Sequence, residues 1–474
     1  MSIGPIDIAA LDGGRVTVAP DKLGALASGV DGALLQAGDP GWDESVLIWN
    51  GMAAKVPALV VRPTSVADVA AVVRFAADHG LLLSVKGGGH NIAGTSMAAG
   101  GLAVDMSGLR DVTVDPAAKL ASAGGGCLVK HVDGVTQEHG LAAVLGFVSE
   151  TGVAGLTLGG GFGYLTRRFG WTVDNLESVE IVTADGQVRT AGRNENDDLF
   201  WALRGGGGNL GVVTRFTFRL HEVGPTITAG LIAWSAEHVD EVLGAYKEIT
   251  ESAPRELTVV CNVRLAPPAP FLPTEWHGKP MVGMIVCHSG ENPAADLARI
   301  RDLPTPIADL ITEKPYVAQQ SMLDATQPKG PHYYWKTEFV PGLSEDFLGT
   351  FRDEGLRVTS PMSQSIMFHL AGALNEHDAD DGAMGNREAQ YVTGFAGSWP
   401  AQDPQSAEHV AWARESWEKI RKFSVGNYVN FQVADDDAAR TAAAYGANFE
   451  RLRQVKSVYD PHNLFRVNRN VSPG

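Results

Sequence analysis

The chain has 474 residues, of which 55 are glycine, about 12% against the ~7% usual in soluble proteins. Basic residues number 38 and acidic residues 55, a formal net charge of −17. This charge argues against binding to nucleic acid or to anionic membranes, because both require clustered Lys and Arg. A hydrophobic content of 44% is sufficient for packed cores and excludes a disordered chain. The length predicts two or three domains.

The cysteines predict a reducing environment. There are three, Cys127, Cys261 and Cys287, and their odd number and wide spacing favour neither a disulfide framework nor a cysteine zinc site. We therefore expect a cytoplasmic location. The first 14 residues lack the basic and apolar regions of a secretion signal, and no later segment offers 18 uncharged apolar residues, so no membrane span is expected.

The first 220 residues alternate short strand and helix patterns. Residues 57–63 predict a strand, and residues 64–80 predict a helix that begins with a Ser65–Asp68 capping box and ends at Gly80. The apolar run at 81–85 predicts a strand that leads directly into a glycine turn. Farther along, residues 184–186 (Ala-Asp-Gly) predict a hairpin turn. This order indicates one α+β unit.

From Gly224 onward glycine becomes rarer and the predicted strands become longer. Residues 257–265 and 281–290 predict strands, and 236–253 predict a helix. We assign 223–437 to a second domain. The tail from 438 predicts one long helix that ends at Asp460-Pro461 and that could pack on either domain.

Four glycine clusters lie within 125 residues, at 87–89, 124–126, 159–163 and 205–211. The last contains Gly206-x-Gly208-x-x-Gly211, the letters of a dinucleotide fingerprint. That fingerprint needs a strand before it and a helix after it. Here residues 196–205 are helix-like and 212–220 strand-like, so a Rossmann site is disfavoured. Four clusters together favour an extended dinucleotide held by backbone N–H groups.

Longer motifs then identify a family. Residues 85–94 (VKGGGHNIAG), 150–176, 199–214, YVNF and YDPHNLF resemble the berberine bridge enzyme-like flavoproteins of the vanillyl-alcohol oxidase and p-cresol methylhydroxylase superfamily. The resemblance implies an α+β fold with a p-cresol methylhydroxylase-type FAD-binding domain at 1–222, its core at about 55–222. It also implies a substrate domain at 223–437 with an antiparallel sheet covered by helices, and a 438–474 segment that returns to the FAD domain.

For the cofactor, the resemblance implies FAD bound covalently through the 8α carbon to His90. Relatives with a second bond use a cysteine eleven residues before the 159–163 cluster, and here that position is Val148, so a single bond is expected. Cys127 is interpreted as a small buried residue. Thr151, isosteric with valine, occupies the position that admits oxygen. The 205–211 cluster is expected to serve packing. The predicted FAD-binding residues are Lys86, Gly87, Gly88, Gly89, His90, Asn91, Thr151, Gly152, Gly155, Gly159, Gly160, Gly163 and Asn430.

The catalytic base is predicted from the resemblance as well. Tyr428 matches the tyrosine of the family's YxN motif, although an ordinary phenol pKa near 10 makes it a poor base unless its surroundings tune it. The segment that supplies a Glu or Lys in other members corresponds to 390–399, where Val392 and Gly394 stand instead. Tyr391, Glu338 and His369 are alternative candidates.

These features predict an oxidase that converts an alcohol, such as a sugar, an aromatic alcohol or a secondary-metabolite hydroxyl, to a carbonyl, with O2 as acceptor and H2O2 as product. Oxidative cyclisation or desaturation, a flavin-dependent dehydrogenase and a flavin-binding protein without turnover are the alternatives. The acidic runs at 376–381 and 435–437 are interpreted as solvated, and no metal is predicted. A small-molecule substrate is expected, while its identity and the oligomeric state stay open.

Overall fold

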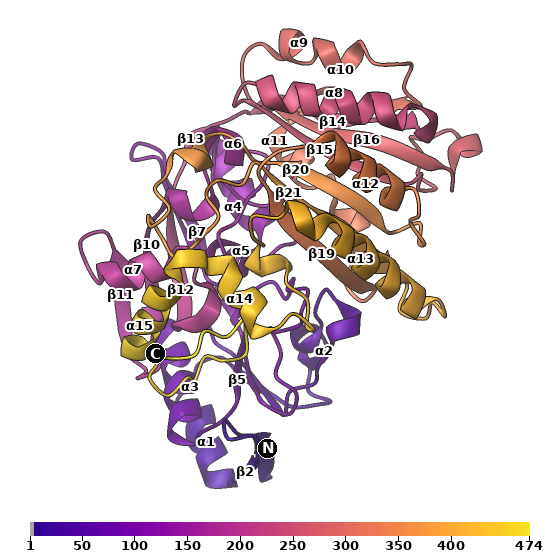
Figure 1. The fold of residues 1–474 in the computed structure, drawn as a ribbon. Helices are drawn as coiled ribbons and strands as arrows, with labels where there is room; N and C mark the ends of the chain where they lie inside the picture. Colours follow the sequence, from indigo (N-terminus) through magenta and orange to yellow (C-terminus); the bar gives the residue numbers. More distant parts are fainter. Residues whose placement is uncertain (1–3) are drawn as a thin grey trace.

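A computed structural model describes residues 4–474. Residues 1–3, the start of the segment inspected for a secretion signal, lie outside it. The chain forms three main sheets, and Figure 1 shows the third set apart from the first two. Within the described residues, no helix is long and apolar enough to cross a membrane. The three cysteines are buried and free.

The first sheet confirms the predicted alternation of strands and helix. Its order is β3 (Ala33–Leu35), β4 (Leu59–Arg62), β6 (Leu102–Asp105), β5 (Leu83–Lys86), with β4, β6 and β5 parallel. Helix α3 (Val66–Asp78) begins at the predicted capping box, in which the Ser65 hydroxyl accepts from Asp68 N and the Asp68 carboxylate accepts from Ser65 N. Its apolar side packs on this sheet. A small hairpin of β1 (Ile6–Ala9) and β2 (Arg15–Val18) and helix α1 (Pro20–Ser28) precede the sheet.

The second sheet is antiparallel, in the order β11 (Val188–Gly192), β10 (Leu176–Val182), β12 (Val212–Arg219), β8 (Leu120–Gly124), β7 (Val112–Asp115). The predicted hairpin turn joins β10 to β11, and Gly186 there has φ +72°. Helix α7 (Asp197–Leu203) precedes the 205–211 cluster and β12 follows it. This confirms the helix–glycine–strand order that disfavoured a Rossmann site.

The third sheet is antiparallel throughout and has the order β17-β14-β16-β15-β20-β21-β19, with β18 beside β14. Its strands are β14 (Thr226–Ser235), β15 (Leu257–Leu265), β16 (Pro280–His288), β17 (Ala308–Asp309), β18 (Thr312–Pro315), β19 (His332–Val340), β20 (Gln364–His369) and β21 (Tyr391–Trp399). Helices α8 (Val239–Ser252), α12 (Glu345–Gly355) and α13 (Ser406–Ile420) cover one face (Figure 1). The predicted antiparallel sheet covered by helices is confirmed.

Alternation along β15 sets the two faces of the third sheet. Val259, Cys261 and Val263 point into the core under the helices. Because successive strand residues point to opposite faces, the intervening Asn262 and Arg264 point the other way, toward the first two sheets. The face without helices is therefore free to form a site.

The tail departs from the prediction of one long helix. It forms α14 (Ala438–Tyr445) and α15 (Phe449–Tyr459), separated by Gly446 at φ +55°. That backbone conformation is left-handed and incompatible with a continuous α-helix, and glycine adopts it at little cost. Leu452 and Val455 of α15 pack in the core that contains α7, so the tail returns to the second sheet.

The other short elements are α2 (Trp42–Val46), α4 (Val129–Thr136), α5 (Val153–Leu158), α6 (Thr166–Phe169), α9 (Pro293–Asp296), α10 (Ala298–Arg301), α11 (Tyr316–Gln320), β9 (Leu141–Ala142) and β13 (His221–Glu222).

Candidate active site

A cavity of about 430 Å³ lies between the face of the third sheet that no helix covers and the first two sheets. Its size falls within the range of ligand-binding sites. Its walls come from separate parts of the chain: 87–92, 146–158, 207–213, the open faces of β14, β15, β16 and β20, and the C-terminal stretches 428–431 and 465–469. The surface is mostly apolar, with polar side chains at a few points.

Glycine lets two loops meet at the cavity wall. A Cβ on Gly88 would collide with the backbone of Gly152, and a Cβ on Gly152 would collide with that of Gly88. Gly89 has φ +69°, a conformation that favours glycine. Gly87 and Gly155 also line the cavity, as does Thr151. These predicted residues are therefore brought together, with main-chain groups exposed between them.

His90 extends from the first of these loops. Its ring stacks on Trp49, with centroids 4.5 Å apart and planes 13° from parallel. Its Nε2 atom is buried and has no hydrogen-bond partner. Burial lowers the pKa of His90 to about 4, so the ring is neutral at physiological pH. The neighbouring Asn91 also lines the cavity, and its Oδ1 accepts from Thr95 N at 3.1 Å, which fixes the loop.

Gly159, Gly160 and Gly163, which were predicted to bind FAD, do not line the cavity, whereas Phe162 between them does. A Cβ on Gly159 would collide with the Asn430 side chain, and one on Gly160 would collide with Met384. A Cβ on Gly163 would collide with the Leu145 carbonyl. The cluster is packed behind the residues that face the site.

The 205–211 cluster, expected to serve packing, also contributes to the cavity wall. Gly207, Gly208 and Gly211 line the cavity together with Asn209. Gly207 has φ +71°. The expected packing holds for Gly205 and Gly206, where a Cβ would collide with Met384 and with the Ala202 carbonyl.

Tyr428 lies in the cavity wall with its hydroxyl held by two donors. The Gly161 N–H donates to Tyr428 Oη at 3.0 Å, and Asn430 Nδ2 donates to it at 2.9 Å. Both bonds favour the phenolate, but burial outweighs them and raises the pKa of Tyr428 to about 12. Asn430 also lines the cavity. Within residues 4–474, the surroundings of Tyr428 therefore do not lower its pKa toward neutral pH, as a base at that pH would need.

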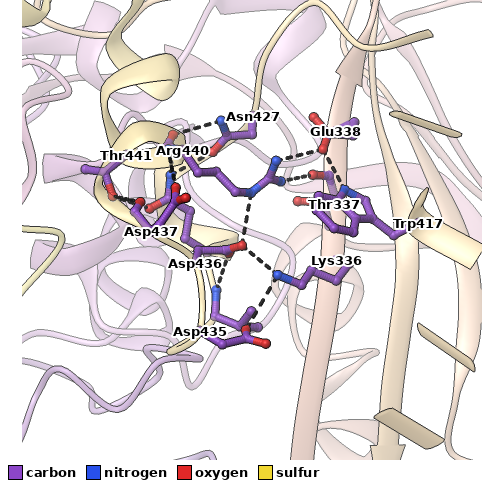
Figure 2. Close-up of polar contacts among 12 residues, drawn as sticks. Lys336, Thr337, Glu338, Trp417, Asn427, Asp435, Asp436, Asp437, Arg440 and Thr441 are labelled. Carbon is purple, nitrogen blue, oxygen red and sulfur yellow. Dashed lines mark hydrogen bonds and ion pairs between the residues drawn. The ribbon is translucent and has the colours of Figure 1, made fainter. Parts of the chain in front are cut away.

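Glu338 does not reach the cavity. Its carboxylate accepts from Trp417 Nε1 at 2.6 Å, from Ser424 Oγ at 2.6 Å and from Arg440 at 2.8 Å. Figure 2 shows this carboxylate among the residues that fasten the C-terminal segment to β19. The Glu338 carboxylate, one of the predicted base candidates, is therefore engaged by three donors, one of them a cation, away from the cavity.

The 435–437 run belongs to the same network: Asp435 and Asp437 are exposed, as the solvated interpretation implies, but the side chain of Asp436 is not. Asp436 is buried and pairs with Lys336 of β19 at 2.6 Å and with Arg440 at 3.2 Å. Asp435 pairs with Lys336 at 3.5 Å (Figure 2). These ion pairs hold the segment that carries Tyr428 and Asn430 against the third sheet.

The other predicted residues also lie outside the cavity. Tyr391 Oη is hydrogen-bonded to Thr250 Oγ1 at 2.7 Å, under helix α8. His369 is buried and stacks on Tyr391. Lys86 donates to the Ser45 carbonyl at 2.7 Å and the Glu44 carbonyl at 2.9 Å, so its ammonium secures α2. Tyr391, His369 and Lys86 therefore do not line the cavity.

Val148 and Cys127 lie where the sequence reasoning implies. Val148 lines the cavity. Cys127 is buried in the core of the second sheet and does not line the cavity. Burial raises the pKa of its thiol to about 11.

Sequence reasoning missed the polar residues of the third sheet, Asn262, Arg264 and Gln364, all of which line the cavity. Two polar residues at alternate positions of the otherwise apolar 257–265 strand were the available signal. It also missed the tail residues that line the cavity. These are Phe465, Val467, Asn468 and Arg469.

One group of acidic residues and a histidine resembles a metal site in composition. Asp174, His377 and Asp381 place ligand atoms within 4.8 Å of one another. However, Arg387 donates to both oxygens of Asp174 at 2.7 and 2.8 Å, and Arg204 pairs with Asp381 at 3.0 Å. These cations already neutralise the carboxylates, so the group is an ion-pair network.

Comparison with known proteins identifies the family. Residues 57–192 match a family model for an FAD binding domain, and 427–472 match one described as berberine and berberine like. A FAD-linked oxidoreductase of Dictyostelium discoideum is 30% identical over 456 residues, which cover 94% of this chain and 95% of the relative. The chain belongs to the berberine bridge enzyme-like FAD-linked oxidoreductases. The resemblance inferred from the motifs is confirmed.

Two further comparisons give the same result. The (R)-6-hydroxynicotine oxidase of Paenarthrobacter nicotinovorans is 30% identical, over 94% of this chain and 97% of that protein. The crystal structure of 6-hydroxy-D-nicotine oxidase from Arthrobacter nicotinovorans superposes with a TM-score of 0.80 and 27% identity, covering 94% of this chain and 98% of that chain. The protein is therefore an enzyme, a FAD-dependent oxidoreductase with the p-cresol methylhydroxylase type of fold.

The cavity of this berberine bridge enzyme-like protein fits FAD. Its glycine-lined wall leaves backbone groups accessible at Gly87–Gly89, Gly152 and Gly207–Gly208, and such groups bind phosphates. The Nε2 atom of His90 is buried without a partner at the same wall. Phe465 and Asn468 of the tail complete the enclosure.

Proposed function

We propose that the protein is an oxidase that converts the hydroxyl of a small-molecule substrate to a carbonyl, with O2 as electron acceptor and H2O2 as product. We further propose that FAD is held by a single covalent bond to His90. When bound, FAD supplies the hydride acceptor. The observation that carries the proposal is Tyr428, a proton-exchanging group held by two fixed donors in the wall of the cavity.

The state of His90 supports its part in the proposal. A neutral imidazole has a free electron pair and can act as a nucleophile, and burial keeps this ring neutral. Trp49 stacks on the ring and fixes its plane. With Val148 at the wall, the proposal includes no second bond to the cofactor. We propose that the predicted neighbours Gly87, Gly88, Gly89, Asn91, Thr151, Gly152 and Gly155 bind FAD as well.

Tyr428 is proposed to accept the proton that the substrate hydroxyl loses. The described residues that line the cavity include no Asp, Glu or Lys, so no carboxylate or amine competes for this role. The Gly161 N–H and the Asn430 amide hold Tyr428 Oη in place and stabilise it when it is deprotonated. Because the pKa of Tyr428 is about 12, the phenolate is a minor form at neutral pH. Activity should therefore rise with pH.

The test uses the purified flavin-loaded enzyme and a panel of sugars, aromatic alcohols and polyketide-like alcohols, with peroxide release as the readout. For the best substrate, kcat/KM should rise toward about tenfold per pH unit between pH 7 and 10, because the phenolate fraction grows by that factor. Tyr428→Phe should lower kcat/KM by about 100-fold or more and abolish this slope. Tyr459→Phe, outside the cavity, is the matched control.

Two outcomes would contradict the proposal. Unchanged kinetics in Tyr428→Phe would exclude this residue as the proton acceptor. An alcohol that reduces the flavin without peroxide release would exclude the oxidase reaction and leave a dehydrogenase.

A further inference from the structure

Arg264 is a charged residue in the cavity without a partner of opposite charge. It lies on β15, and its Nε donates to the Leu265 carbonyl at 3.3 Å and a terminal nitrogen donates to the Pro361 carbonyl at 3.1 Å. No carboxylate of residues 4–474 lies within 4.0 Å of its guanidinium. Burial lowers the pKa of Arg264 only to about 10, so the group stays charged at neutral pH.

The rest of the cavity makes this charge unusual. Among the described lining residues, the only other charged side chain is Arg469. Both arginines donate to two backbone carbonyls, but Arg469 has Asp435 and Asp436 near it, and their charges raise its pKa against the effect of burial. Arg264 thus has no countercharge in the described part of a protein whose net charge is −17.

Two neutral amides lie beside Arg264. Gln364 of β20 is its direct partner in the sheet register, and Asn262 Nδ2 donates to Gln364 Oε1 at 3.2 Å. Asn262 Oδ1 is buried without a hydrogen-bond partner. A buried polar atom without a partner costs free energy, which a bound molecule can recover. The three side chains form a polar group at one end of a surface that is otherwise apolar.

We propose that Arg264 binds a carboxylate of the substrate and that the substrate is therefore a hydroxy acid. The planar guanidinium can donate two parallel hydrogen bonds to a carboxylate, and its single charge matches that of one carboxylate. A phosphate monoester dianion would leave one negative charge without a partner. Only one part of this inference, that the substrate carries a hydroxyl, rests on the proposed function. The carboxylate is inferred from Arg264 itself.

The sheet register indicates the shape of this substrate. Arg264 pairs with Gln364 and Val260 pairs with Phe368, so the two pairs are four residues apart, or roughly 13 Å at ~3.3 Å per residue. Phe368 lies at the end nearer Tyr428, with Phe431 between them at centroid distances of 6.4 and 5.0 Å. The substrate is thus elongated and apolar between its two polar ends.

Arg264 is half-buried and its hydrogen bond to the Pro361 carbonyl is exposed to solvent, so the carboxylate end lies toward an open side of the cavity. Phe271, in the loop that follows β15, lines the cavity and is 40% exposed. A carboxylate at this end keeps part of its hydration, so the cost of removing it from water is smaller than in the interior. Arg264 therefore determines specificity and does not take part in the oxidation itself.

The test measures binding to the flavin-loaded enzyme through the change in flavin absorbance. The probes are 6-phenylhexanoate and its neutral amide, 6-phenylhexanamide. In the wild type the carboxylate should bind at least about tenfold more tightly than the amide. Arg264→Met should remove this preference and leave amide binding unchanged, and Arg264→Lys should retain part of it. Arg255→Met, which removes an exposed arginine of the same domain, is the matched control.

Flavin content and melting temperature of each variant show that it is folded and loaded. Equal affinities in the wild type, no binding of the carboxylate, or a preference that survives in Arg264→Met would overturn the inference. Tighter binding of 6-phenylhexyl phosphate would overturn the choice of a carboxylate. If the binding results are as expected but no hydroxy acid yields peroxide, the proposed function fails and the role of Arg264 stands.

Discussion

Replacing Asp133 with asparagine should stabilise the protein above pH 7. Asp133 lies on α4, fully buried behind the cavity wall. Its Oδ2 accepts from Gln320 Nε2 at 3.0 Å, and the same nitrogen donates to the carbonyl of Gly146, which lines the cavity, at 3.1 Å. Its Oδ1 has no partner. Burial raises the pKa of Asp133 to about 7, because a charge at this place has too few hydrogen bonds.

The size of the effect follows from that pKa. The rise in the pKa of Asp133 from the ordinary 3.8 to about 7 corresponds to roughly 4 kcal/mol in the free energy of unfolding. The folded state binds this proton more tightly than the unfolded state, so the free energy of unfolding falls as pH rises from about 4 to about 7. Above pH 7 the full cost is present. Asparagine cannot ionise, and its amide nitrogen replaces an oxygen that has no partner, so the variant avoids the cost.

The assay is urea unfolding of wild type and Asp133→Asn at pH 5 and pH 8, with the exposed Asp302→Asn as control. The variant should exceed the wild type by about 4 kcal/mol at pH 8 and by about 2 kcal/mol at pH 5. The control should follow the wild type at both values. A stability difference that is the same at pH 5 and pH 8 would refute the reasoning, since only ionisation of Asp133 makes it depend on pH.

The remaining predictions concern the cofactor bond and the network of Figure 2. His90→Ala should release FAD into the supernatant of acid-precipitated protein, whereas His139→Ala, an exposed histidine, should keep the colour in the pellet; a coloured His90→Ala pellet would place the bond elsewhere. Glu338→Gln should lower the free energy of unfolding by about 3 kcal/mol, because it leaves a mostly buried Arg440 with less countercharge. Glu345→Gln, the control at an exposed ion pair, should lower the free energy of unfolding by under about 1 kcal/mol. If Glu338→Gln instead lowers kcat without loss of stability, Glu338 becomes a base candidate again.

Local sequence patterns predicted much of the fold. The α3 capping box, the 184–186 turn and the 257–265 strand depend on neighbouring residues, so the sequence specifies them directly. The prediction of one continuous tail helix is wrong at Gly446. The residues on both sides favour a helix, but the backbone of Gly446 adopts a positive φ. Because glycine adopts many backbone conformations, the sequence alone does not show which one it takes; the packing around it decides.

The same limit applied to the site. A run of glycines shows that side chains are excluded, but it does not show what excludes them. At Gly159 the obstacle is Asn430, which is 271 positions later in the chain, whereas at Gly207 the space belongs to the cavity. Glu338 and Tyr391 are chemically suited to proton transfer, and only their distant partners Arg440 and Thr250 reveal that they are already engaged.

The tail residues in the cavity wall have a consequence for how the enzyme acquires its cofactor. Phe465, Asn468 and Arg469 close a site whose first glycine loop begins at residue 87. Because synthesis proceeds from the N-terminus, the wall is incomplete until residue 469 has been made and α15 has packed beside α7. The wall of the flavin site is thus complete only in a chain that extends to residue 469, and loss of the tail would leave the cavity beside the His90 loop open.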